Sequence, residues 1–203
     1  MTRHFASNVY FFDVPQFLPA IKEIADRELS KLRVVDKMYP VIQTGSLFDP
    51  ETSDFASYVA QTAWNILNEQ GYDMDNFNTV LDEMWAQQLN MRGMHIEHVH
   101  SMGAQISGFY FLETPENSTK PVFHDPNQAK RQIELPQREE SKITEASTAV
   151  NYNVTPGQLI MFNSWLPHSF APNASSKAFK FIHFNVKVYP AHNQEIPPPA
   201  EVI

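Results

Sequence analysis

Residues 93–100 read Gly-Met-His-Ile-Glu-His-Val-His, and a further histidine, His168, follows much later in the chain. Residues two apart on a β-strand point to the same face of the sheet, so His98 and His100 are expected to project together. A later return strand would bring His168 beside them. Three neutral imidazoles that converge on one point form a transition-metal site and leave further coordination positions open. We therefore predict a metal site built from His98, His100 and His168.

The composition is that of an acidic globular chain. It has 203 residues, 42% of them hydrophobic and 12% aromatic, and a formal net charge of −8. This length suffices for one domain with a full core. An acidic chain without a basic run offers no electrostatic footprint for nucleic acid. The absence of cysteine excludes disulfides and thiolate chemistry, which leaves His, Asp and Glu as metal ligands.

The expected location of the protein rests on the absence of two sequence features, a signal peptide and a membrane span. The amino-terminal residues form no apolar run that would suit a signal peptide, and no stretch is long enough to span a membrane. We expect a cytoplasmic protein without a membrane partner. Its substrate would be a peptide or a small molecule, and its oligomeric state stays open.

Two amphipathic helices are predicted before residue 76. The first has Pro15 in its first turn and continues to about Leu32, and the second begins after Asp49 and stops near Gly71. The buried stripe expected of the first helix consists of Phe17, Leu18, Ile21, Ile24, Ala25, Leu29 and Leu32. Helices that precede a run of strands suggest a buttress against one face of a sheet.

From residue 76 onward the pattern is that of short strands. We expect them at residues 79–91, 95–100, 105–113, 121–124, 150–154, 158–163, 168–171 and 179–189, with another at residues 8–12. The polar stretch 127–148 is predicted to be a surface excursion of the kind that acts as a lid. Such a series favours a sandwich or barrel. The predicted plan is one domain, 1–203, with a helical buttress (1–75), a β core (76–190) and an extended tail (191–203).

A second distinctive block, residues 154–173, reads Val-Thr-Pro-Gly-Gln-Leu-Ile-Met-Phe-Asn-Ser-Trp-Leu-Pro-His-Ser-Phe-Ala-Pro-Asn. Together with the His-x-His pair, the run Ser107-Gly108-Phe109-Tyr110-Phe111 and the later Asp125-Pro126, it resembles a bacterial and phage branch of the 2-oxoglutarate and iron(II)-dependent oxygenases, which are similar to prolyl-4-hydroxylases. The resemblance covers about residues 80–188. It implies a mainly β double-stranded β-helix, a jelly-roll or cupin-like barrel, behind the N-terminal helices. It also implies Fe(II), 2-oxoglutarate and O2, with ascorbate as an optional reductant.

The resemblance can be carried over residue by residue. His98 and His168 match the two iron-binding histidines of the family, and His100 matches a position normally held by Asp. Ser107 matches a small residue that lines the 2-oxoglutarate pocket. His95 matches a tyrosine that commonly touches this cosubstrate.

One departure concerns the cation that holds the far carboxylate of 2-oxoglutarate. The Arg of the family aligns with Phe179, and the neighbouring Lys180 would face the other side of its strand unless a bulge intervenes. We expect a bulge near Ala178 that turns Lys180 inward, where it would bind the cosubstrate.

The resulting expectation is an Fe(II)- and 2-oxoglutarate-dependent dioxygenase. It would hydroxylate a substrate that the sequence does not reveal, peptidyl by analogy with prolyl hydroxylases. Two alternatives stay open. A cupin-type three-histidine metalloprotein that does not use 2-oxoglutarate is supported by Phe179 in the place of Arg. A non-catalytic β-sandwich binding module is supported by the missing Asp.

Overall fold

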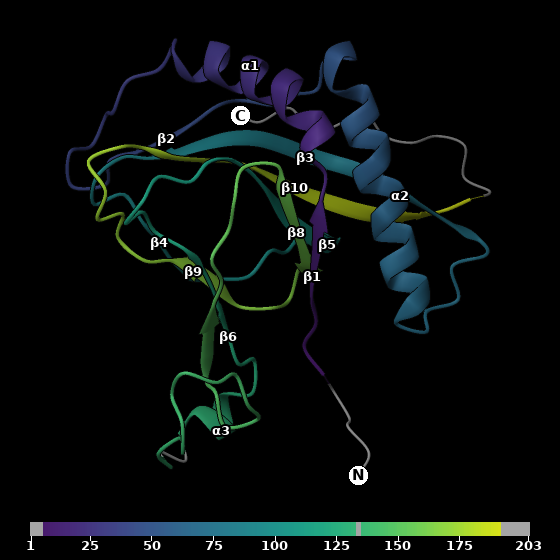
Figure 1. Ribbon diagram of the computed structural model, residues 1–203. Helices are drawn as coiled ribbons and strands as arrows, with labels where there is room; N and C mark the ends of the chain where they lie inside the picture. Colours follow the sequence, from purple (N-terminus) through teal and green to yellow (C-terminus); the bar gives the residue numbers. More distant parts are fainter. Residues whose placement is uncertain (1–5, 133–134, 192–203) are drawn as a thin grey trace.

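The computed structural model describes residues 6–132 and 135–191 as two antiparallel sheets with two helices outside the larger one (Figure 1). Residues 192–203 of the predicted tail lie outside the described residues. In chain order the elements are β1 (Val9–Asp13), a 3-10 turn (Pro15–Phe17), α1 (Leu18–Leu29), β2 (Val41–Gln43), a 3-10 turn (Pro50–Thr52), α2 (Ser53–Glu69), β3 (Phe77–Leu89), β4 (His95–His98), β5 (Ala104–Glu113), β6 (Pro121–His124), α3 (Gln128–Arg131), β7 (Ala149–Asn151), β8 (Gln158–Asn163), β9 (His168–Phe170) and β10 (Phe179–Pro190).

Local signals define the ends of the two long helices. Before α2, the Asp49 side chain accepts the N–H of Glu51, and the Thr52 hydroxyl accepts the N–H of Asp49. This capping box satisfies amide groups that have no partner within a helix. After α2, Gly71 adopts a φ of 93°, a conformation that glycine reaches without steric cost. The helix α1 ends at Leu29, one turn before the predicted end at Leu32.

The larger sheet has the order β1-β8-β5-β10-β3-β2, and its two faces carry different cores. On the outer face, Ile182 and Phe184 of β10 belong to one buried cluster with residues of α1 and α2, including Ile21 and Phe55. Figure 1 shows both helices on this side of the sheet. The helices thus cover the face that would otherwise expose a continuous apolar surface.

The smaller sheet, in the order β4-β9-β6-β7, lies against the opposite face of the larger one. The space between the sheets is filled by aromatic rings, such as Phe181 of β10, which stacks on Phe170 of β9 with ring centroids 4.7 Å apart. This arrangement is the predicted double-stranded β-helix. None of the described helices is both long and apolar enough to cross a lipid bilayer.

Three local features differ from the sequence prediction. Residues 41–43 form β2, which pairs with β3 and is not among the predicted strands. The strand β4 ends at His98, so His100 lies beyond it. The polar excursion contains the short helix α3, whose Arg131 pairs with Glu97 of β4 and whose Lys130 pairs with Asp125.

Candidate metal centre

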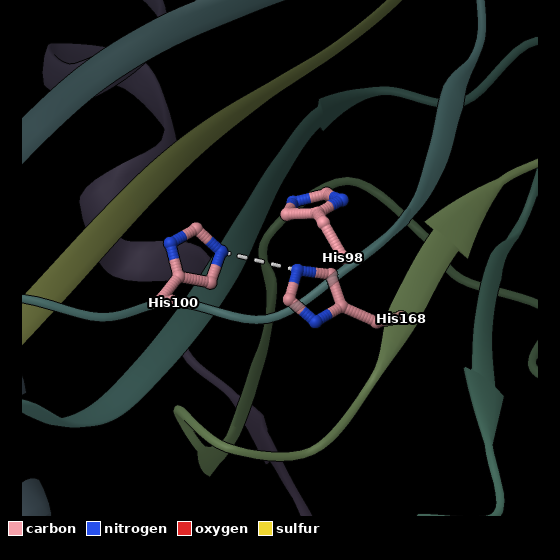
Figure 2. Close-up of side chains that lie close together, drawn as sticks. All are labelled: His98, His100 and His168. Atoms are coloured by element: carbon pink, nitrogen blue, oxygen red, sulfur yellow. Dashed lines mark hydrogen bonds between the residues drawn. The ribbon is translucent and has the colours of Figure 1, made fainter.

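His98 and His168 meet where the strands β4 and β9 pair. His98 is the last residue of β4 and His168 is the first of β9, and the two are register partners in the smaller sheet. His100 follows two residues later, and its backbone N–H donates to the carbonyl of Ser164 at 2.9 Å. Figure 2 shows the three imidazoles facing one another.

The three rings have the spacing of a metal site. One nitrogen from each of His98, His100 and His168 lies within 4.8 Å of the others. The Nε2 atoms of His100 and His168 are 3.1 Å apart (Figure 2). Two nitrogens that each lie about 2.1 Å from one metal cannot be more than about 4.2 Å apart. The separation of this pair would therefore let both nitrogens bind one ion.

Backbone carbonyls fix the orientation of two of these rings. Nδ1 of His98 lies 2.7 Å from the carbonyl oxygen of Ile96, and Nδ1 of His168 lies 2.9 Å from that of Leu166. A carbonyl only accepts hydrogen bonds, so each Nδ1 carries the proton and each Nε2 keeps a free lone pair. Such outer partners orient metal-binding histidines and raise their basicity.

Burial keeps two of the three imidazoles, those of His100 and His168, neutral. It lowers the pKa of His168 to about 3 and that of His100 to about 4, so both are unprotonated at neutral pH. The group contains no carboxylate, so a divalent ion bound here would keep both positive charges. Imidazole suits iron, zinc, copper and nickel, and the donor set therefore fits iron(II).

Ser107 lies in a buried polar chain next to the histidines. Its hydroxyl shares a 2.8 Å hydrogen bond with that of Ser164 and donates to the amide oxygen of Asn185 at 2.6 Å. The Asn185 amide nitrogen donates to Glu83 on β3 at 2.6 Å. Because the Ser164 carbonyl accepts the N–H of His100, this chain supports the backbone of a candidate ligand.

His95 is the first residue of β4, three residues before His98, and the pairing of β4 with β9 is irregular between the two. Its Nδ1 shares a 2.8 Å hydrogen bond with the Tyr39 hydroxyl, and its ring meets the ring of Phe170 edge-on. Burial lowers the pKa of His95 to about 4. Its Nε2 is buried and has no hydrogen-bond partner among the described residues, so this nitrogen is free for a ligand.

The structure does not bring Lys180 to the histidines. Its ammonium lies 2.7 Å from Asp26 of α1 and 3.3 Å from Glu113, on the outer face of the larger sheet. Phe179 and Phe181 are buried between the sheets instead. The expected inward turn at Ala178 is therefore wrong: two phenylalanines fill the inner face, and normal strand alternation directs Lys180 outward.

Sequence reasoning missed two groups beside the metal centre. His183 is 2% exposed, and its ring stacks on that of His100 with centroids 4.5 Å apart. On its other side it lies 4.5 Å from the ring of Trp85. The signal that could have found His183 is strand alternation, because it shares the inner face of β10 with Phe179 and Phe181.

Comparisons with known proteins identify a family for the part of the chain that carries the three histidines. The family model described as "Putative 2OG-Fe(II) oxygenase" matches residues 83–185, which include all three histidines. No curated protein sequence matches the chain.

Solved structures share the fold at low sequence identity. A prolyl-4-hydroxylase from Pseudomonas putida is 10% identical, with a TM-score of 0.59 over 89% of this chain and 93% of that one. AviO1 from Streptomyces viridochromogenes is 14% identical, with a TM-score of 0.63 over 96% and 93%. The viral collagen prolyl hydroxylase from Paramecium Bursaria Chlorella virus-1, solved as a 2-oxoglutarate complex, is 12% identical, with a TM-score of 0.54 over 88% and 94%.

The family model covers half of the chain, and its span contains the candidate metal ligands. Enzymes of this family use Fe(II), 2-oxoglutarate and O2. The chain belongs to the 2-oxoglutarate and Fe(II)-dependent oxygenases.

Proposed function

We propose that this oxygenase hydroxylates a C–H bond of a peptide substrate, with iron(II) held by His98, His100 and His168. The observation that carries the proposal is the convergence of three imidazole nitrogens within 4.8 Å of one another. Three protein ligands leave coordination positions for a cosubstrate and for oxygen. When bound, iron and 2-oxoglutarate supply the oxidising chemistry, and the protein supplies position and shielding.

The residues around the ligands serve position and shielding. The carbonyls of Ile96 and Leu166 hold two of the rings so that Nε2 faces the metal position. The ring of Phe162 lies 4.7 Å from that of His168, and the ring of Phe109 lies 5.6 Å from it. Both phenylalanines are buried, so they exclude water from the inner side of the centre.

The outer side of the centre supports a substrate with apolar groups. Val99 and Trp165 are each about half exposed and flank the hydrogen bond between His100 and Ser164. Ile96, on the same strand as His98, is 70% exposed. Exposed apolar side chains beside a site favour an apolar partner surface. Two of the similar structures are prolyl hydroxylases, which supports a peptide as the substrate class.

Peptide oxidation tests the proposal. The iron-loaded protein would be given 2-oxoglutarate, O2 and a set of proline-containing and aliphatic peptides, and both succinate and peptide mass would be measured. We expect at least one peptide to gain one oxygen atom in step with succinate. The His168→Ala variant should give neither product. Succinate formation that no peptide stimulates, with no oxygen gained by any peptide, would contradict the peptide assignment.

A further inference from the structure

Two buried nitrogens beside the candidate metal centre have no hydrogen-bond partner in the part of the chain that the structure describes. Nε2 of His183 and Nε1 of Trp85 are both buried and unpaired among the described residues. Buried polar groups are almost always hydrogen-bonded, and leaving one unpaired destabilises the fold. The indole nitrogen can only donate, so its missing partner is an acceptor.

The two groups belong to one patch that continues from the metal ligands. His183 and Trp85 are cross-strand partners on β10 and β3, and their rings lie 4.5 Å apart. The His183 ring is also 4.5 Å from that of His100. The ring of His183 thus lies directly beside that of a candidate metal ligand, and the ring of Trp85 lies beside His183.

Charge determines what kind of anchor such a ligand needs. Three neutral imidazoles leave a divalent metal with two positive charges, and 2-oxoglutarate brings two negative ones. The sum is zero without any further cation. A carboxylate held here would therefore need hydrogen-bond donors to replace its lost water, but no extra positive charge.

The side chains on the inner face of β10 offer a carboxylate hydrogen-bond donors but no positive charge. Phe179 and Phe181 occupy the first inner positions of this strand, and His183 is the next residue on the same face. Lys180 is directed outward and is engaged by Asp26 and Glu113. On this face of the strand, His183 is thus the first group that can donate a hydrogen bond.

We propose that the N–H groups of His183 and Trp85 hold the second carboxylate of 2-oxoglutarate, the one that does not chelate the metal. This inference rests on the proposed function, because it assigns an anchor to the cosubstrate of the same centre. His183 and Trp85 then act as cosubstrate-binding residues, and the chain recognises a dicarboxylate without a salt bridge.

A pair of 2-oxo acids separates this role from metal chelation. 2-Oxobutyrate has the chelating end of 2-oxoglutarate but lacks the second carboxylate. Binding of each acid to the zinc-loaded full chain would be measured by calorimetry for the wild type and for His183→Phe and Trp85→Phe. Both substitutions keep an aromatic ring and remove the N–H, and Trp85→Phe suffices alone if His183→Phe does not fold.

We expect each variant to weaken 2-oxoglutarate roughly ten- to a hundredfold, as for a hydrogen bond to a charged group, and to leave 2-oxobutyrate binding unchanged. Trp64→Phe is the matched control, since the Trp64 indole donates to the Phe77 carbonyl at 3.0 Å on the helix side of the molecule. Lys180→Met should also leave both acids unaffected. In a nitrogen-15 spectrum, the Trp85 indole signal should shift with 2-oxoglutarate and stay in place with 2-oxobutyrate.

Three results would overturn the anchor. The first is unchanged 2-oxoglutarate affinity in both variants, and the second is an equal loss for the two acids, which would place the effect on the metal. The third is a selective loss of 2-oxoglutarate in Lys180→Met. A wild-type chain that binds zinc but not 2-oxoglutarate would overturn the proposed function as well, so the two failures are distinguishable.

Discussion

At the scale of single residues, the centre depends on which nitrogen of each histidine carries a proton. His98 and His168 each place Nδ1 against a backbone carbonyl, which leaves Nε2 as the atom that could bind a metal. His100 has a different support, because its backbone N–H is bound by Ser164 while its ring stacks between those of His168 and His183. Each ring is thus held in place before a metal binds.

Removal of any one ligand should release most of the iron. The outer partners of metal-binding histidines are worth roughly 10- to 100-fold in metal affinity, and loss of a ligand itself should exceed that range. Iron(II) affinity of His98→Ala, His100→Ala and His168→Ala would be measured by competition with a chelator. His124→Ala is a matched control, because His124 bonds to Ser169 and does not belong to the group. Full iron occupancy in His100→Ala would require another donor.

A carboxylate at position 100 should be tolerated. His100→Asp keeps a metal ligand at the same place in the chain and lowers the charge of the centre by one. We expect the variant to retain iron, as measured by metal analysis after gel filtration. Loss of all iron from a variant with an unchanged circular dichroism spectrum would show that the site accepts imidazole only.

At the scale of elements, the strand β5 passes so close to its neighbours that one position must be glycine. A Cβ atom on Gly108 would lie 2.4 Å from the backbone oxygen of Ile160 on β8 and 2.3 Å from the ring of Phe184 on β10. Gly108→Ala should therefore lower the free energy of unfolding by about 1–3 kcal/mol, the usual cost of overpacking. Gly45→Ala is the control, because a Cβ there meets nothing within 4 Å. Equal urea midpoints for the two variants would contradict this packing.

The contact between α1 and the larger sheet should depend on pH. Burial alone would raise the pKa of Asp26, but hydrogen bonds from Lys180 and Lys22 outweigh it and lower the pKa below its usual value of 3.8. A carboxyl whose pKa is lower in the folded state stabilises the fold above its usual pKa, and this contribution is lost as pH falls through the folded value.

Asp26→Asn measures that contribution. At neutral pH the variant should lose up to about 1 kcal/mol of unfolding free energy, a small value because the carboxylate is partly exposed. The difference from wild type should shrink once the pH falls below 3.8, the usual pKa of the group. Urea unfolding at both pH values tests this, with Glu23→Gln on the exposed side of α1 as the control. A difference that does not change with pH would mean that the ion pairs contribute nothing.

At the scale of the whole molecule, most of the fold follows from local patterns. The strands 121–124 and 158–163 were predicted with the bounds that the structure shows, because Asp125-Pro126 and Thr155-Pro156-Gly157 mark the turns next to them. The strand β2 could not be predicted, because its three residues are held by pairing with distant residues of β3 rather than by their own pattern. The short helix α3 could not be predicted for the same reason, since its Arg131 pairs with the distant Glu97 of β4.

The sequence predicted which three histidines come together, but it did not predict the side chains that surround them. The spacing of His98 and His100 pointed to one face, and the structure brings His168 to them across the smaller sheet. The direction of Lys180 depended on whether a bulge precedes it, and the packing of Phe179 and Phe181 between the sheets decided that question. The family match favours an oxygenase over the cupin-type and non-catalytic alternatives.

The central claim is that the three histidines hold an iron to which 2-oxoglutarate binds directly. Its most direct test is anaerobic titration of 2-oxoglutarate into the iron(II)-loaded protein, followed by visible absorption. The predicted result is a weak metal-to-ligand charge-transfer band that requires both iron and 2-oxoglutarate and is missing in His168→Ala. An iron-loaded wild-type protein that shows no band at saturating 2-oxoglutarate would contradict the claim.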